Sequence, residues 1–416
     1  MSVHSDDSLF VLILLFNSIM APQYDAIIVG AGPAGLSAGI TLAKNGKSVL
    51  VFDKQVRGTI FPRGETIHRL PFVEQQILYP GFYERQVINH TNRRIYYSSS
   101  GKKSTAMRLK GDDENLIFEY GSFIEAITTY AEDSGVKIQF GTQVTDLLEE
   151  GGVVNGVKTT TKNGSSLDFT AKLIIGAGGY DCIVANNTGV RSQLLLNPIM
   201  KVIGEAPNFV ENRLEFHFVS GVGYLPGVCF IFPRGGHRVE TGYSIFPECL
   251  TNPSDAPYIN VAKEWERLLQ EHPTYSRVMQ GLQPSFKAPS FIPFTRLLED
   301  FIPKPGVILV GDAVSQVEPM GGSGINAALE MGYYVAQASL TELFLPSQGI
   351  AQLDSSLWKT ILPRLLMKIR GSPRFKKLQK QYMIIPKFKR WFFKQNGNPA
   401  KMDHRWWAFN LLLKLR

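Results

Sequence analysis

Three glycine-rich segments carry the residues whose types and spacing could do chemistry. The first joins two short apolar runs through a turn and a helix start, and its turn holds Gly30, Gly32, Pro33, Ala34 and Gly35. In such a turn the first glycine permits the tight bend, the second lets backbone approach a pyrophosphate, and the third lets the helix pack on the strand. Asp53 ends the second apolar run, is followed by Lys54, and can accept a hydrogen bond from a ribose hydroxyl. This order predicts a dinucleotide site; a turn of the same shape that binds no nucleotide is the alternative.

The other two segments supply a second acid and a second glycine-rich turn. Gly311 and Asp312 follow the apolar run 307–310, and a carboxylate just past a strand can hold a polyol hydroxyl. The next turn leads into a helix and contains Gly321, Gly322, Gly324, Ile325 and Asn326. Free amides at a helix start can stabilise negative charge on a ring carbonyl. Because a long cofactor needs both of its ends bound, the three segments together are more specific than any one alone.

The surrounding pattern predicts an α/β protein that positions these segments. Residues 26–29 and 49–52 are expected strands, and Ser122 and Gly135 bracket an amphipathic helix over 122–134. Residues 58–72 are expected to be a loop that enters a helix ending near Pro80. Alternation and turn residues predict strands over 86–120, a hairpin of 153–161 with 166–170 around Asn163 and Gly164, a separate strand over 172–175, an antiparallel sheet over 198–248, and helices over 260–281 and 325–340.

These elements predict a Rossmann-like nucleotide-binding domain with an inserted β-rich domain and a helical tail. The nucleotide-binding domain is expected to be discontinuous, with residues 22–75, 120–185 and 290–345. The antiparallel substrate domain then takes residues 76–119 and 186–289, and the tail residues 346–416. Residues 1–21 are a leader whose apolar run 9–16 is too short to span a bilayer, and Met20 is a candidate start.

Charge is unevenly distributed over the 416 residues. Residues 346–416 hold 16 Lys and Arg against two acids, or +14, whereas the rest has 28 bases and 34 acids, or −6. Four of the five tryptophans also lie in this tail, and basic heads with large apolar bodies suit a membrane headgroup interface. A helical cap docked on the acidic body is the alternative. Nucleic acid is disfavoured because the aromatic residues cluster instead of standing as isolated stacking platforms.

Cysteine usage favours a reducing compartment. Cys182, Cys229 and Cys249 have no metal or redox spacing, so we expect free thiols, no metal site and a cytoplasmic protein. Together with the basic tail, this predicts peripheral association with a membrane.

The three segments resemble those of the flavoprotein superfamily that contains aromatic hydroxylases and geranylgeranyl reductases. The resemblance implies that Gly30, Gly32, Gly35 and Asp53 hold the ADP half of FAD. It also implies that Asp312 holds the ribitol phosphate half, and that residues 321–326 face the flavin pyrimidine ring. Arg63 resembles an arginine that lies along FAD, with a solvated loop charge as the alternative.

Within this superfamily the resemblance is greater to the geranylgeranyl reductases. Their motif Tyr-x-Trp-x-Phe-Pro is matched by Phe232 and Pro233, although Phe230 stands for the tryptophan and Val228 for the tyrosine. The hydroxylases carry an acid and an arginine in a Gly-Ala-Asp-Gly motif that serves FAD and NAD(P)H handling. Here Gly178 and Ala185 stand at those positions, which argues against a hydroxylase driven directly by NAD(P)H and favours delivery of electrons by another protein. The reductant is left open between NAD(P)H and a reduced electron-carrier protein.

The resemblance implies an FAD-dependent reductase of carbon–carbon double bonds in a polyprenyl chain on a lipid or lipid precursor. The apolar substrate would lie on Phe216, Phe218, Phe230 and Phe232, which are otherwise ordinary sheet core. A flavin can deliver hydride while an acid protonates the other carbon, and the candidate acids are Tyr224, Cys229 and His217, each with a structural role as the alternative. An FAD monooxygenase of an apolar substrate and a non-enzymatic membrane scaffold are the competing hypotheses.

Overall fold

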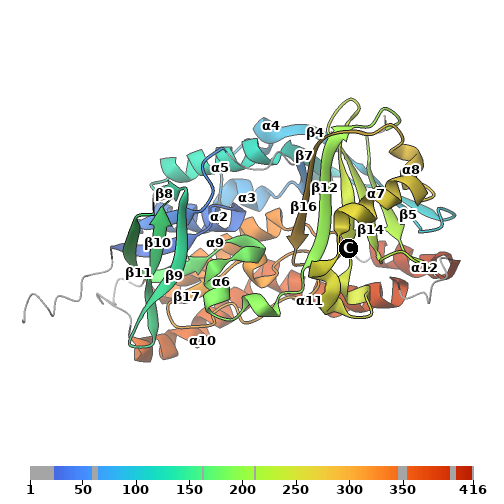
Figure 1. Cartoon of the computed structure of the whole chain (residues 1–416). Coiled ribbons are helices and arrows are strands. Elements are labelled where there is room, and N and C mark those ends of the chain that lie inside the picture. Colours follow the sequence, from blue (N-terminus) through green and yellow to red (C-terminus); the bar gives the residue numbers. More distant parts are fainter. Residues whose placement is uncertain are drawn as a thin grey trace, which may run out of the picture.

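The computed structural model describes residues 23–58, 64–161, 164–209, 212–344, 354–393 and 400–414. It is built on two large sheets side by side, with tail helices beneath both (Figure 1). The first sheet has the order β8-β2-β1-β11-β10-β9, with β17 also paired to β11. Its strands are β1 Tyr24–Val29, β2 Val49–Asp53, β8 Lys137–Phe140, β9 Thr142–Glu150, β10 Val153–Thr161, β11 Ser166–Gly176 and β17 Val307–Leu309.

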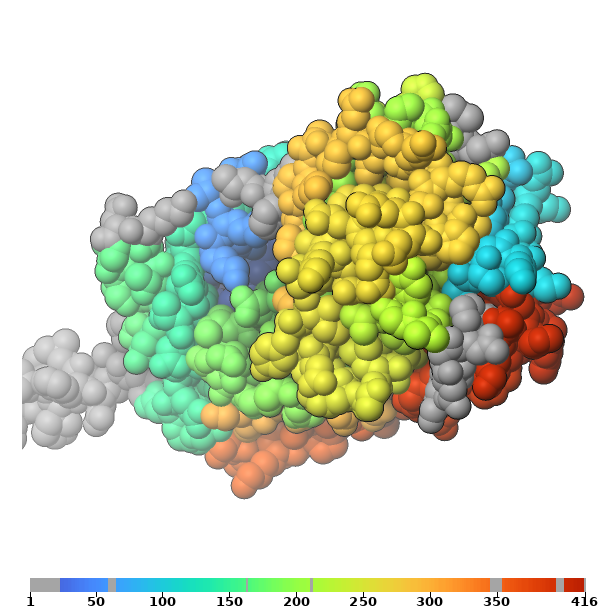
Figure 2. Space-filling model, turned by 45° about the vertical axis from the view of Figure 1, so that its right-hand side comes forward, coloured from blue at the N-terminus to red at the C-terminus, as the bar shows by residue number. Residues whose placement is uncertain are grey.

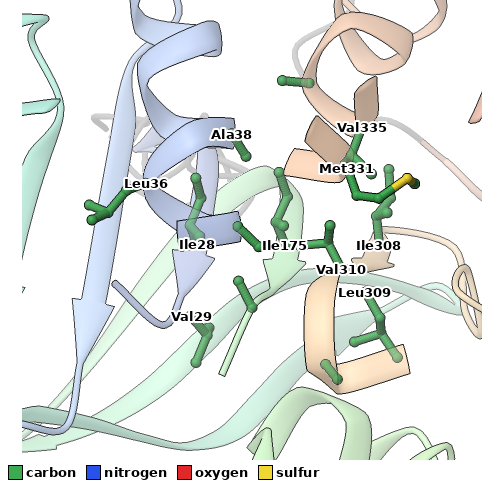
Figure 3. Close-up of a cluster of buried hydrophobic side chains, with 14 of the residues drawn as sticks. Ile28, Val29, Leu36, Ala38, Ile175, Ile308, Leu309, Val310, Met331 and Val335 are labelled. Carbon is green, nitrogen blue, oxygen red and sulfur yellow. The ribbon is translucent and has the colours of Figure 1, made fainter. Parts of the chain in front are cut away.

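The central strands of this sheet are parallel, and their stretches 26–29, 49–52, 173–175 and 307–309 are apolar and buried, because helices cover them. β1 pairs in parallel with both β2 and β11, and β17 pairs in parallel with β11. Side chains of these strands pack against Met331 and Val335 (Figure 3). The helices of this half are α2 Pro33–Lys44, α3 Pro71–Gln76, α4 Phe82–Gln86, α5 Tyr120–Asp133, α6 Ile183–Asn187 and α9 Ile325–Glu342.

The second sheet is largely antiparallel and has the order β16-β12-β15-β14-β13-β5-β6. Its strands are β5 Arg93–Tyr97, β6 Ser104–Arg108, β12 Asn197–Glu205, β13 Leu214–Val219, β14 Gly227–Pro233, β15 Arg238–Ile245 and β16 Gln283–Ile292. One face packs on α7 Val261–Glu271 and α8 Tyr275–Val278 (Figure 1). A small third sheet has three strands in the order β3 Gly64–His68, β7 Asn115–Glu119 and β4 Val87–Thr91.

Several local expectations are wrong, and each has a physical reason. Residues 64–68 form β3 because they find a partner in β7, a long-range pairing that no local pattern indicates. The expected hairpin strand and the strand over 172–175 are one long strand, β11, which pairs with β10 at one end and β1 at the other. The helix expected over 260–281 is divided because Pro273 cannot continue it. β16 extends to Ile292, past the domain boundary expected at 289.

The tail forms three helices: α10 Ser355–Gly371, α11 Pro373–Phe393 and α12 Ala400–Lys414. Pro373 begins α11, whereas Pro363 and Pro386 lie inside helices. Trp358 is 1% exposed and packs into the core of the first half. None of the helices in the described ranges is both long and apolar enough to cross a bilayer.

Basic residues of α10 and α11 pair with carboxylates of the body. Arg364 and Lys368 lie 3.0 and 2.6 Å from the carboxylate of Glu342, and Arg374 pairs with Glu330. The first part of the tail therefore caps acidic side chains of the body. This is the arrangement given above as the alternative to a membrane-binding tail.

A glycine-to-alanine substitution tests the contact between α2 and α9, two helices that are far apart in the sequence. A Cβ at Gly332 in α9 would lie 2.3 Å from the carbonyl oxygen of Ala34 in α2, so the helices would have to separate. We expect Gly332→Ala to lower the free energy of unfolding by about 1–3 kcal/mol, measured by urea denaturation. Gly39→Ala is the matched control, because its Cβ would meet its nearest neighbours at 3.4 Å, an ordinary contact. Equal unfolding midpoints for the two variants would contradict the close packing.

Candidate active site

The first glycine-rich turn lies where the parallel strands of the first sheet end. Gly30 has φ +113°, and a Cβ there would lie 2.4 Å from the carbonyl oxygen of Ala177. A Cβ at Gly35 would lie 2.0 Å from the oxygen of Gly30, so only glycine allows α2 to begin against the strand. Gly32 differs, since its Cβ would meet nothing within 4 Å. It caps α2 without a side-chain hydrogen bond, which leaves the helix start open toward a phosphate.

Asp53 is held in place by backbone amides on both of its oxygens. Oδ2 accepts from the amide of Ala31 at 2.8 Å, and Oδ1 accepts from the amide of Gln55 at 2.8 Å. Each carboxylate oxygen has a further lone pair that can accept a ribose hydroxyl. Lys54 instead points to an exposed ion pair with Asp181 at 3.2 Å. Arg63 lies outside the described residues.

The fold brings the second segment beside the first. Gly311 follows β17 with φ +70°, and its Cβ would lie 3.1 Å from the Cβ of Ala34 in the first turn. Its amide donates to Oε1 of Gln316 at 2.8 Å, a residue that sequence reasoning missed because nothing in its spacing marks it. Asp312 also faces the third segment, since its Oδ1 lies 3.3 Å from the position of a Cβ on Gly324.

The third segment contains a buried acceptor that fits a flavin ring. Asn326, in the first turn of α9, is 6% exposed and donates through Nδ2 to the carbonyl of His68 at 2.8 Å. Its Oδ1 is buried and has no hydrogen-bond partner among the described residues. A buried acceptor of this kind is normally satisfied. An N–H of the flavin pyrimidine ring would satisfy it, so the residues present fit FAD.

A buried polar network that the sequence did not reveal supports Asn326. Nη2 of Arg94 lies 2.8 Å from Nε2 of His68, and Nδ1 of His68 lies 3.3 Å from the carbonyl of Glu114. Because arginine can only donate, Nε2 accepts and Nδ1 carries the proton. Burial and the nearby guanidinium lower the pKa of His68, so the imidazole stays neutral at pH 7. Arg94 also donates through Nε to Asn115 at 2.9 Å.

The four predicted substrate residues share one face of the second sheet, which we call the aromatic face: Phe216 and Phe218 of β13, and Phe230 and Phe232 of β14. The rings of Phe230 and Phe232 are 4.9 Å apart, and those of Phe216 and Phe232 are 6.0 Å apart. Phe218 belongs to a cluster with Val317, against which Phe216 and Met320 pack. The aromatic face therefore adjoins the turn that precedes α9.

The three candidate proton donors lie on the opposite side of the second sheet. Nδ1 and Nε2 of His217 are 2.7 Å from Thr274 and 3.0 Å from Glu215, and burial lowers the pKa of this histidine. Cys229 is fully buried in the core beneath α7, where burial raises the pKa of its thiol. Tyr224 donates to Glu271 at 2.8 Å and packs on that same core. These contacts favour the structural role for each.

Removal of one carboxylate tests whether the second segment holds the cofactor. We expect Asp312→Ala to lower FAD occupancy, because a half-buried acceptor for hydroxyls of the cofactor is lost, at a cost of about 1–3 kcal/mol of binding. Flavin absorbance per protein, and titration of the apoprotein with FAD, measure the change. Asp300→Ala removes an exposed acid of the same half and should keep full occupancy. Full occupancy in both variants would take Asp312 out of the site.

The structure and sequence are similar to those of known proteins. A digeranylgeranylglycerophospholipid reductase of Methanococcoides burtonii is 26% identical over 370 residues, covering 85% of this chain and 81% of that protein. A protein of the same name from Picrophilus torridus is 24% identical over 77% of this chain and 78% of its own length. The solved structure of a geranylgeranyl bacteriochlorophyll reductase-like protein from Thermoplasma acidophilum superposes with a TM-score of 0.67 at 18% identity, covering 89% of this chain and 90% of that one.

Other solved structures show that the fold serves more than one reaction. A myxobacterial FAD-dependent chondrochloren halogenase superposes with a TM-score of 0.64 at 17% identity, covering 86% of this chain and 82% of that one. The family model described as FAD binding domain matches residues 23–343, which hold all three glycine-rich segments. The chain therefore belongs to the FAD-binding domain family, and FAD is its cofactor.

Proposed function

We propose that this enzyme is an FAD-dependent reductase that saturates carbon–carbon double bonds of a polyprenyl chain on a lipid or lipid precursor. The observation that carries the proposal is the aromatic face, an apolar surface that adjoins the turn before α9. Relatives named digeranylgeranylglycerophospholipid reductase, similar over most of their length, support the same chemistry. In this proposal the first sheet carries FAD in a Rossmann-like domain, and the second sheet carries the substrate.

The residues of the chain divide the work between the cofactor and the lipid. The glycine-rich turns and Asp53 would hold the ADP half of FAD, Asp312 the ribitol half, and Asn326 the ring. Lys54 and Arg63 remain predicted contacts of the cofactor. When bound, the flavin supplies hydride to carbon. The aromatic face binds isoprene units by burial of apolar area, at about 25 cal/mol per Å², and keeps water from the reacting atoms.

A monooxygenase is the second candidate, and one contact argues against it. The hydroxylase motif places an acid where this chain has Gly178. A Cβ at Gly178 would lie 3.1 Å from the Cα of Cys182, so a larger residue there would require the backbone to shift. Ala185, which stands for the arginine of that motif, is fully buried. These departures support delivery of electrons by NAD(P)H at a different site or by a reduced carrier protein.

We further propose that the outer face of the tail binds a membrane peripherally. Met383, Ile384 and Trp391 of α11 are 58%, 58% and 42% exposed, and the exposed Lys387 lies between them in sequence. Trp407 and Leu411 of α12 are 65% and 52% exposed. Exposed tryptophan and aliphatic side chains beside basic residues suit the headgroup region of an anionic leaflet. This surface is separate from the basic residues that pair with the body.

The reaction itself is tested without oxygen. Enzyme reduced anaerobically and mixed with a geranylgeranylated glycerophospholipid should give products heavier by two hydrogens per reduced bond, as measured by mass spectrometry. A product that requires oxygen and gains one oxygen atom, with no hydrogenated species, would establish the monooxygenase instead.

A pair of neighbouring truncations tests the aromatic face. We expect Phe230→Ala to lower kcat/KM for the lipid by roughly tenfold or more, because apolar contact with the substrate is lost. Ile231→Ala is the matched control, since Ile231 follows on the same strand but is buried toward α7. It should lower stability and leave kcat/KM close to that of the wild type. Equal losses of kcat/KM in the two variants would remove the aromatic face from the substrate site.

Membrane binding is tested on the outer face of α12. We expect Trp407→Ser combined with Leu411→Ser to weaken binding to anionic vesicles by roughly tenfold, because apolar insertion is lost. Salt should weaken the binding of the wild type without abolishing it, since salt screens charge and not insertion. Tyr258→Ser combined with Leu167→Ser removes two exposed apolar side chains elsewhere and should have no effect on sedimentation with vesicles.

A further inference from the structure

Helix α12 is apolar on two sides. Its inner residues are buried and recur at helical spacing: Met402, Trp406, Phe409 and Leu413. Trp407 and Leu411 on its outer side are more than half exposed. An amphipathic helix that only covers a core presents polar residues to water. The outer apolar residues of α12 instead belong to the membrane-binding surface proposed above.

The inner side of α12 covers one end of the aromatic face. The ring of Phe218 lies 5.1 Å from that of Phe409 and 6.1 Å from that of Trp406. Phe409 also packs on Tyr96 of β5 at 5.1 Å. Figure 2 shows α12 in red directly beneath the segment that holds β5 and β6. Phe218 is only 4% exposed, because Phe392 and Phe393 of α11 pack on it together with Trp406 and Phe409 of α12. The α12 side of this end of the aromatic face stays closed to a lipid while α12 is in place.

Helix α11, by contrast, is fixed to the body by buried polar contacts. Nζ of Lys389 lies 2.6 Å from Glu248, both side chains are nearly fully buried, and the ammonium lies 4.5 Å from the ring centre of Phe294. Tyr382 donates to the carbonyl of Val317 at 2.9 Å, in the turn before α9. Loss of either partner of a buried ion pair is strongly unfavourable. We therefore treat α11 as a permanent part of the site.

The side-chain hydrogen bonds of α12 to the second sheet run to the β5–β6 hairpin. Oγ1 of Thr105 lies 2.6 Å from Asn410 and accepts from Trp406 at 2.8 Å. Ser100 in the hairpin turn donates to Asp403 at 2.7 Å. Ser100, Thr105, Asp403 and Asn410 are partly exposed, so water or lipid headgroups can replace their contacts when the helix leaves.

We propose that α12 is a displaceable cover of the polyprenyl site, and that isoprene units of a membrane lipid take the place of Trp406, Phe409 and Leu413 on the sheet. The inference rests on the proposed function. In water, displacement would expose both the aromatic face and the inner side of α12. At a bilayer the inner side enters the apolar region and the isoprene chain covers the sheet, so little apolar area meets water. The cover thereby opens where the substrate is.

A reversible cross-link tests whether α12 must move. Thr105→Cys with Asn410→Cys places two thiols where the wild-type side chains touch, and Cys182 and Cys229 are buried. With the disulfide closed, FAD content, photochemical reduction of the flavin and its reoxidation by ferricyanide should match the wild type. Reduction of the vesicle-bound lipid should fall by roughly tenfold or more and return with a phosphine reductant, as expected for a locked lid. The two single-cysteine variants are the controls.

A second pair of variants gives an answer even if the disulfide forms poorly. Trp406→Ala with Phe409→Ala loosens the inner side, and should speed reoxidation of the reduced flavin by a short polyprenyl alcohol several-fold in the absence of vesicles. Trp407→Ala with Leu411→Ala alters the outer side and should not. A cross-linked enzyme at full rate, or inner and outer variants with equal rates, would overturn the cover. A wild-type enzyme that hydrogenates no polyprenyl substrate would instead overturn the proposed function.

Discussion

The close contact of α2 with α9 is the constraint on which the rest of the structure depends. Oγ of Ser37 donates to the carbonyl of Leu329 at 2.6 Å, and Gly332 lets the two helices meet at Ala34. These residues are nearly 300 positions apart in sequence, with the whole second sheet between them. Only when they meet do the two ends of the candidate cofactor site lie at one edge of the first sheet.

The sequence predicted those parts of the site whose geometry is local. A strand, a tight turn and a helix start are encoded within about ten residues, so the glycines of the first turn and Asp53 could be named without a structure. The same holds for the side-chain alternation that places Phe216, Phe218, Phe230 and Phe232 on one face. The contacts that complete the site are long-range. No spacing in the sequence marks Gln316, His68 or Arg94. Their roles are recognised only from the distances in the structure, between Gln316 and Gly311 and between His68 and Arg94.

The same limit explains where the structure departs from the expectations and where it favours a stated alternative. His217 and Cys229 were considered because their chemical types suit a proton donor, but alternation along the strands sends both away from the aromatic face. Strand β3 was missed because its partner β7 lies about fifty residues further along the chain. Proline inside a helix normally bends or ends it, but the tail helices do not end at two of their prolines. Packing against the body keeps α10 and α11 continuous through Pro363 and Pro386, since burial of their apolar sides outweighs one lost backbone hydrogen bond at each.

Helix α9 joins two regions that are otherwise unrelated. Its first turn holds Asn326 of the candidate flavin site, and its last residue, Glu342, pairs with both Arg364 and Lys368 of α10. A carboxylate at the C-terminal end of a helix is unfavourable toward the helix dipole, and the two cations compensate for it. Eighteen residues of continuous helix form a stiff rod of about 27 Å between these ends. Because the proposed flavin contact and the first tail helix meet the two ends of this one helix, we expect an apoprotein to hold its tail less firmly than the holoprotein does.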